Sequence, residues 1–256
     1  MENKEVSIEI SSCVDFSSGV TEGRYFNPLI ERMEVEQFEL NQWGAKNRIK
    51  IFFPTDQAND SIFNMAEEFR SKLVSLFVLI SNCDVSARDE IVLEELNGNV
   101  VTEVRRGDER EIKRRIGPLI KFEITKSKIS EVSELEWNAL KRFKETFLSI
   151  DFSKKLESLF SAIDTLAKND FSEAAGVRDR MEKYLLNLNI PKEIVNAIPK
   201  DRGLKIHENT IPSGADKYFA SLRERVADDF AIRFGVRIQK SKIQIGDQFQ
   251  IIGSKK

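Results

Sequence analysis

Apolar and polar residues alternate with a period of two in the N-terminal part of the chain, as they do in β-strands with one buried face. The alternation covers residues 5–10, 32–40, 48–53 and 119–125. Two further β-prone runs within 90–106 flank Asn97-Gly98, a dipeptide that favours the positive φ angles of a type I′ hairpin turn. These segments predict a mainly antiparallel sheet.

One segment in this part of the chain has helical periodicity instead. Apolar residues recur at spacings of three and four from Ile62 to Ile80 and form one continuous stripe. Asp60 or Ser61 can cap the start of this helix. Residues 1–130 are therefore predicted to form an antiparallel sheet that carries one helix.

The apolar spacing becomes helical from Ser133 onward. Ser133 is followed three residues later by Glu136, the capping-box pattern that begins a helix. Further apolar stripes predict helices near Phe152, at about 173–188 and at about 215–234. Prolines and glycines interrupt residues 191–214, as is typical of turns.

The period of two returns after Gly235, and this tail is expected to add strands to the N-terminal sheet, although nothing local fixes its partner. The predicted fold class is therefore α+β. Its parts are an α+β N-terminal domain over 1–130, a helical bundle over 131–235 and a β-strand tail over 236–256.

Composition and charge restrict the class of protein. Hydrophobic residues make up 41% of the 256 and charged residues 32%, as in a soluble globular protein. The 40 basic and 42 acidic side chains nearly balance, so no global field attracts nucleic acid or membranes. Any RNA contact therefore needs a local basic patch.

Several classes of site and location are disfavoured. One histidine and two distant cysteines predict no metal site, no disulfide framework and no cofactor. Neither a phosphate-binding glycine-rich loop nor a serine-hydrolase motif occurs. The N-terminal segment lacks the apolar core of a secretory signal, and the apolar run 73–80 is too short to span a bilayer. We therefore expect a cytoplasmic protein without a membrane segment.

The stretch KDRGLKIHENT, residues 200–210, contains the single histidine of the chain, His207, five positions after Arg202. Imidazole exchanges protons near neutral pH, and a guanidinium binds phosphate oxygens in a bidentate manner. Cleavage of RNA by its own 2′-hydroxyl needs both kinds of group. On an ideal helix, however, five residues separate two side chains by about 140°.

Residues 150–234, about a third of the chain, resemble the HEPN family (higher eukaryotes and prokaryotes nucleotide-binding), small helical bundles that include many metal-independent ribonucleases. The run KKLESLFSAIDTLA is similar to the first helix of the family. Arg202 and His207 match its motif of Arg, four to six residues, then His, and an apolar helix follows in the expected order. The resemblance implies a metal-independent endoribonuclease with His207 as general acid or base and Arg202 as stabiliser of the pentavalent phosphate.

The resemblance also implies partners and a setting. Members of this family dimerise so that two motifs converge in one cleft, which implies a homodimer acting on an RNA substrate. Many act in prokaryotic defence or stress, some as toxins. The N-terminal domain would then receive a trigger or a regulatory partner, an expectation by analogy alone.

Acidic and basic residues of the helical part are candidates for supporting roles. Glu157 and Asp164 lie seven positions apart, on one face of the predicted helix. In one interpretation, an acidic residue of this helix orients Arg202 and His207. In the other, Glu157 and Asp164 are ordinary solvent-facing charges. The second is favoured, because charges opposite an apolar stripe are the expected pattern. The candidate RNA-binding residues are Arg178, Arg180, Arg223 and Arg225.

Three alternatives stay open. In the first, the helical part is a catalytically inactive HEPN-like module for dimerisation or for binding a nucleotide or partner. Gly203 favours this alternative, because catalytic members usually place a polar residue directly after the arginine. In the second, the helices form an unrelated bundle in a structural or regulatory subunit. In the third, Arg202 and His207 lie on a solvated basic turn after Pro199.

Overall fold

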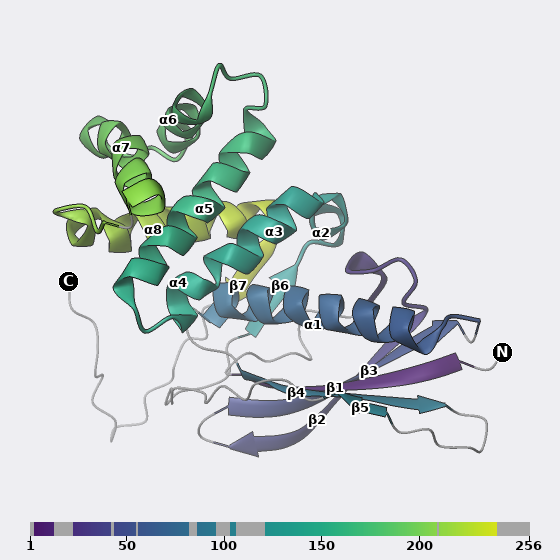
Figure 1. Cartoon of the computed structure of the whole chain (residues 1–256). Helices are drawn as coiled ribbons and strands as arrows, with labels where there is room; N and C mark the ends of the chain where they lie inside the picture. Colours follow the sequence, from purple (N-terminus) through teal and green to yellow (C-terminus); the bar gives the residue numbers. More distant parts are fainter. Residues whose placement is uncertain are drawn as a thin grey trace.

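A computed structural model describes most of the chain. The described residues are 3–12, 23–41, 44–54, 56–81, 86–95, 103–105, 121–208 and 210–239. They form a sheet at the base, one long helix across it and a bundle of further helices above that helix (Figure 1). The predicted α+β class is confirmed.

The N-terminal strands form a five-stranded antiparallel sheet in the order β2-β3-β1-β4-β5. Their bounds are β1 Asn3–Ser12, β2 Arg32–Asn41, β3 Gly44–Pro54, β4 Ser86–Glu95 and β5 Glu103–Arg105. Val6, Ile8 and Ile10 of the central strand are fully buried, as their period of two requires. Strands β4 and β5 pair as the predicted hairpin does, and Asn97-Gly98 lies outside the described residues.

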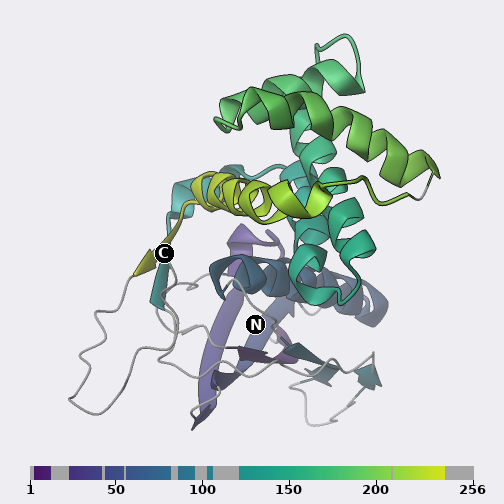
Figure 2. The same cartoon turned by 90° about the vertical axis from the view of Figure 1, so that its left-hand side faces the viewer.

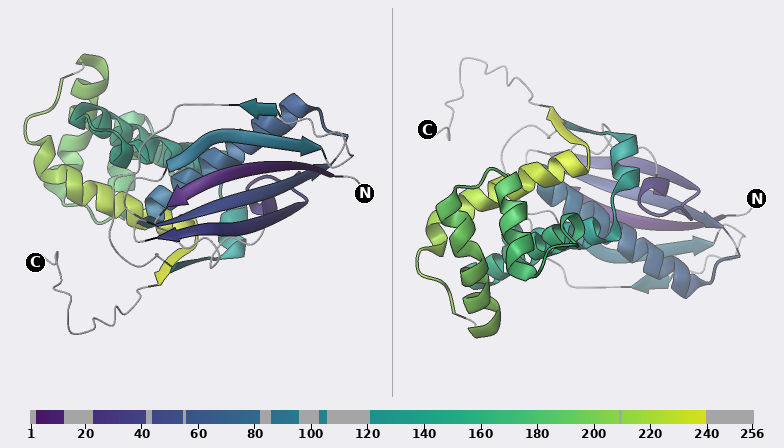
Figure 3. Two further views of the ribbon diagram at one scale, coloured as in Figure 1. Left: turned by 90° about the horizontal axis from the view of Figure 1, so that it is seen from below. Right: turned by 90° about the horizontal axis from the view of Figure 1, so that it is seen from above.

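Helix α1 (Asn59–Ser81) lies across one face of this sheet. It begins at Asn59, just before the predicted caps. Ile62, Phe69 and Leu73 of its stripe are fully buried. Seen from below, the sheet lies in front of α1 (Figure 3, left). Seen from above, α1 lies in front of the sheet, on the side of the bundle (Figure 3, right). A short 3₁₀ helix, η2 (Gly23–Tyr25), precedes β2.

The bundle consists of helices α2 to α8 in the described part of the chain (Figure 2). Their bounds are α2 Lys126–Glu131, α3 Glu134–Phe143, α4 Glu145–Leu148, α5 Phe152–Asp170, α6 Val177–Asn187, α7 Lys192–Glu208 and α8 Ala215–Arg233. The predicted capping box begins α3, because Ser133 Oγ accepts from the Glu136 amide at 3.2 Å and the Ser133 amide donates to Glu136 Oε2 at 2.8 Å. Among the described helices, none is long and apolar enough to cross a membrane.

One continuous core joins the sheet, α1 and the bundle. The ring of Phe26 lies 5.2 Å from Phe69 of α1 and 5.7 Å from Trp137 of α3. The buried ammonium of Lys72 donates to the Phe26 carbonyl at 3.3 Å and to Glu134 at 3.0 Å. Apolar and charged contacts therefore both cross residue 130, and the division of the chain there stays a prediction.

The C-terminal strand pairs differently from the expectation. β7 (Val236–Gln239) pairs antiparallel with β6 (Lys121–Ile124) in a separate two-stranded sheet. The tail thus pairs with a strand that was predicted for the N-terminal sheet, residues 119–125. The prediction that this strand and residues 236–239 belong to that sheet is wrong, and residues 240–256 lie outside the described part. Gly235, at φ +63°, turns the chain after α8, and its carbonyl accepts from the distant Thr125 amide at 2.9 Å, which brings β7 beside β6.

Two glycines give a matched test of this packing. Gly235 has a positive φ, and an added Cβ would lie 2.7 Å from Lys128 Cβ, whereas a Cβ at helical Gly203 would meet nothing within 4 Å. Gly235→Ala should lower the free energy of unfolding by about 1–3 kcal/mol. Gly203→Ala should raise it by about 0.5–1 kcal/mol. Urea denaturation measures both, and equal effects of the two substitutions would contradict this account of the β6–β7 turn.

Candidate functional site

The segment that carries Arg202 is helical, so the alternative of a solvated turn after Pro199 is wrong. Helix α7 passes through Pro199 and Gly203 without a break. A proline inside a helix removes one backbone hydrogen bond and costs about 3 kcal/mol or more. Val195 and Ile198, both buried where α7 packs against α5 and α6, offset this cost. Tertiary packing therefore outweighs the local helix-breaking signals.

Arg202 is held by Asp164 of α5. Arg202 Nη2 donates to Asp164 Oδ2 at 2.9 Å, and the two side chains are 18% and 22% exposed. Asp164 is therefore not a solvent-facing charge, and this acidic residue does approach the arginine. Because the pair is half-buried, it is screened less than a surface ion pair and restricts where the guanidinium lies.

Asp164 also binds a second guanidinium. Its Oδ1 accepts from Arg180 Nε at 3.3 Å and from Arg180 Nη2 at 3.1 Å. One carboxylate thus connects α6 and α7 through α5. It offsets only one of the two positive charges, so the cluster of Asp164, Arg180 and Arg202 keeps a net positive charge.

Two further contacts hold α7 near Arg202. The buried Lys205 Nζ lies 3.6 Å from Oε2 of Glu157. Glu157 is exposed and lies seven positions before Asp164 on α5. The Tyr218 hydroxyl of α8 donates to Asp201 Oδ2 at 2.7 Å. Burial, and then the hydrogen bond to Asp201, raises the pKa of Tyr218 above its usual range, so this hydroxyl stays a donor at neutral pH.

His207 is placed only by its backbone, which lies in the last part of α7. Its side chain lies outside what the structure describes. Arg202, Asp164 and Arg180 are therefore the residues that the fold brings together, and the relation of the imidazole to them stays a prediction.

The four candidate RNA-binding arginines have different surroundings. Arg180 binds Asp164, whereas Arg223 of α8 lies over the rings of Phe147 and Phe219, at 4.6 and 5.6 Å. Arg178 is exposed and donates to Glu182 of its own helix at 2.7 Å. The remaining arginine of the four, at position 225 of α8, is exposed.

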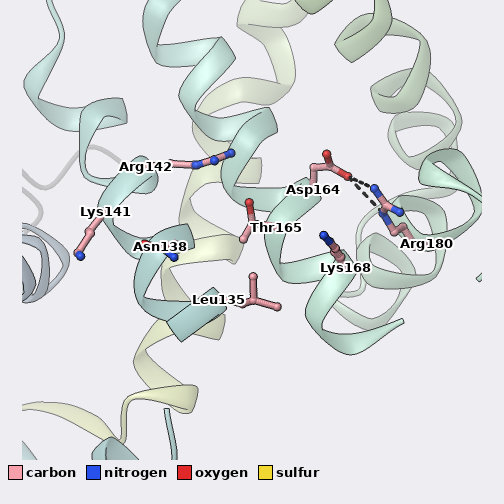
Figure 4. A pocket seen from close by; sticks show the side chains of 8 residues that line it. All are labelled: Leu135, Asn138, Lys141, Arg142, Asp164, Thr165, Lys168 and Arg180. Carbon is pink, nitrogen blue, oxygen red and sulfur yellow. Dashed lines mark hydrogen bonds and ion pairs between the residues drawn. The ribbon is translucent and has the colours of Figure 1, made fainter. Parts of the chain in front are cut away.

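A pocket of about 580 Å³ adjoins Asp164 between α3, α5 and α6 (Figure 4). Its lining comprises Leu135, Asn138, Lys141, Arg142, Asp164, Thr165, Lys168 and Arg180. Sequence reasoning did not single out the basic residues of α3 and α5 here, because cations in the last turn of a helix are expected from the helix dipole alone. In the part of the chain that is described, no group of three or more His, Cys, Asp or Glu side chains is placed to hold a metal ion.

The Asp164 contacts predict a measurable contribution to stability. Asp164→Asn keeps the shape of the side chain but removes the charge that binds Arg180 and Arg202. We expect it to lower the free energy of unfolding by about 1–3 kcal/mol, since these are charge-assisted hydrogen bonds. Arg178→Gln, which removes an exposed pair within α6, should change it by less than about 0.5 kcal/mol. Urea denaturation that finds the two variants alike would show that Asp164 does not hold α7.

Comparisons with known proteins assign no family to this site. A scan against protein-family models, a search of curated proteins and a search of solved structures each found no match to this chain. The chemistry of α5, α6 and α7 is therefore inferred from the residues and their geometry.

Proposed function

We propose that the chain is a metal-independent endoribonuclease of the HEPN type that acts on RNA. The observation that supports this most is the contact between Arg202 and Asp164. It holds the guanidinium on a helix that also carries the only histidine of the chain, His207. A cation whose position is set before substrate binds stabilises developing charge without reorganising in the transition state.

In the proposed reaction, the 2′-oxygen of one nucleotide attacks the adjacent phosphorus and the bond from phosphorus to the 5′-oxygen breaks. His207 takes the proton from the 2′-hydroxyl or gives one to the departing 5′-oxygen, and water takes or gives the other proton. Arg202 offsets the negative charge of the pentavalent phosphorane. Asp164 is a positioning residue, because it acts on the arginine and not on the RNA. The products carry a 2′,3′-cyclic phosphate and a free 5′-hydroxyl.

A homodimer belongs to this proposal. On an ideal helix five positions separate two side chains by about 140°, so a single helix is not expected to present an arginine and a histidine at this spacing on one face. Two copies of α7 that meet across a two-fold axis bring an arginine and a histidine into one cleft. The N-terminal sheet and α1 would then receive the activating trigger or partner, in a cytoplasmic protein of prokaryotic defence or stress.

A binding-only module is the second candidate, and Gly203 favours it. A side chain at this position would meet nothing within 4 Å, so there is room for the polar residue that catalytic HEPN domains usually carry, yet none is present. Such a module would associate with itself or bind a nucleotide or a partner without cutting RNA.

The first test is RNA cleavage in excess EDTA. Purified wild type and His207→Ala are incubated with total RNA, and the fragments are resolved on a gel. Because a positioned general acid or base contributes about 10²- to 10⁴-fold to the rate, His207→Ala should abolish visible cleavage. Glu193→Gln, an exposed change in the first turn of the same helix, should cleave as the wild type does.

The outcomes separate the candidates. Fragments ending in 2′,3′-cyclic phosphate from wild type and Glu193→Gln alone support the ribonuclease. Equal cleavage by His207→Ala removes the histidine from the chemistry. RNA binding or self-association without cleavage, measured by gel shift and light scattering, supports the binding-only module.

A further inference from the structure

Four basic side chains line the pocket beside Asp164. Arg142 extends from α3 toward α5, Lys168 of α5 is drawn between Thr165 and Arg180, and Arg180 enters from α6 (Figure 4). Lys141 lines the same pocket and extends away from this group in the view. Asp164 is the single carboxylate in the lining.

Most of this positive charge is not matched within the bundle. The side chains of Arg142 and Lys168 make no hydrogen bond or ion pair with any part of the chain that the structure describes. Arg180 has the carboxylate of Asp164, which it shares with Arg202. Like charges brought together by three separate helices repel one another, so a bound anion would stabilise this arrangement.

We propose that this pocket binds a chain of two or three phosphate groups, either free or carried by a nucleoside. Guanidinium groups bind phosphate oxygens in a bidentate manner, an ammonium binds them as a point charge, and the Asn138 amide lies in the same lining as a further donor. The volume of about 580 Å³ lies within the range of small-molecule sites, about 300–1,000 Å³.

The lining favours a compact ligand over an RNA strand. Proteins that bind single-stranded RNA combine an extended groove with aromatic side chains on which the bases stack. No aromatic residue lines this pocket, and its one apolar side chain, Leu135, is 39% exposed. The phosphates therefore carry the recognition, with any nucleoside at the open side of the pocket.

The same carboxylate connects this pocket to Arg202. Asp164 Oδ1 binds Arg180 at the pocket, and Asp164 Oδ2 binds Arg202 on α7. A phosphate in the pocket competes with Asp164 for Arg180. A ligand there would thus act on Arg202 through one shared residue, whether or not the chain cleaves RNA.

Isothermal titration calorimetry tests the proposal with three probes: inorganic tripolyphosphate, ATP and a twelve-nucleotide RNA. Wild type should bind tripolyphosphate. Lys168→Glu should weaken this binding about tenfold or more, since it replaces a charge-assisted contact with a repulsive one. Lys154→Glu makes the same change of charge at an exposed position on the same helix, outside the pocket, and should change the affinity by less than about threefold. Asp164→Asn should tighten binding, because it removes the competing carboxylate.

Each outcome supports or overturns the proposal. Equal affinity for tripolyphosphate and ATP means that the phosphate chain alone is recognised, and tighter binding of ATP means that the nucleoside adds contacts. Absence of tripolyphosphate binding, binding of RNA alone, or equal weakening by Lys168→Glu and Lys154→Glu would overturn it. Circular dichroism checks that each variant is folded, and Arg142→Gln replaces Lys168→Glu if the latter is not. Because binding is measured without cleavage, the result is independent of the proposed ribonuclease activity.

Discussion

The hydrogen bonds of the Asp164 carboxylate are the interaction on which both candidate sites depend, the one at Arg202 and the basic pocket at Arg180. It lies midway along α5, binds Arg180 of α6 with one oxygen and Arg202 of α7 with the other, and is 22% exposed. A half-buried carboxylate between two guanidiniums holds three helices in register, but it leaves the cluster positively charged. That residual charge suits phosphate, the chemistry that the arginine of α7 and the adjoining pocket have in common.

This arrangement needs a rigid frame, and Arg233 at the end of α8 supplies much of it. Its guanidinium donates to Asp229 at 2.8 Å, to Asp170 of α5 at 2.9 Å and to Glu136 of α3 at 3.0 Å. Asp229 also accepts from the buried Tyr184 hydroxyl of α6 at 2.9 Å. Four helices are thus tied together around the C-terminal end of α5, and this keeps the bundle in place while the neighbouring pocket carries incompletely matched charge.

Periodicity by itself determined the strands of the N-terminal sheet, helix α1 and most of the bundle. Burial of one face imposes a period of two on strands and of 3.6 on helices, so these elements follow from local spacing. The capping box of Ser133 and Glu136 marked the start of α3 because its two hydrogen bonds join residues three apart. The Arg202 and His207 spacing was visible too, since it depends on sequence alone.

Tertiary structure alone decided how these elements meet. Pro199 and Gly203 indicate a turn locally, yet α7 is helical because its apolar residues are buried against α5 and α6. The partners of Asp164 come from 16 and 38 positions along the chain, and strand β7 pairs with β6 and not with the larger sheet. Contacts between distant residues depend on how buried faces pack together, and no local spacing encodes that choice.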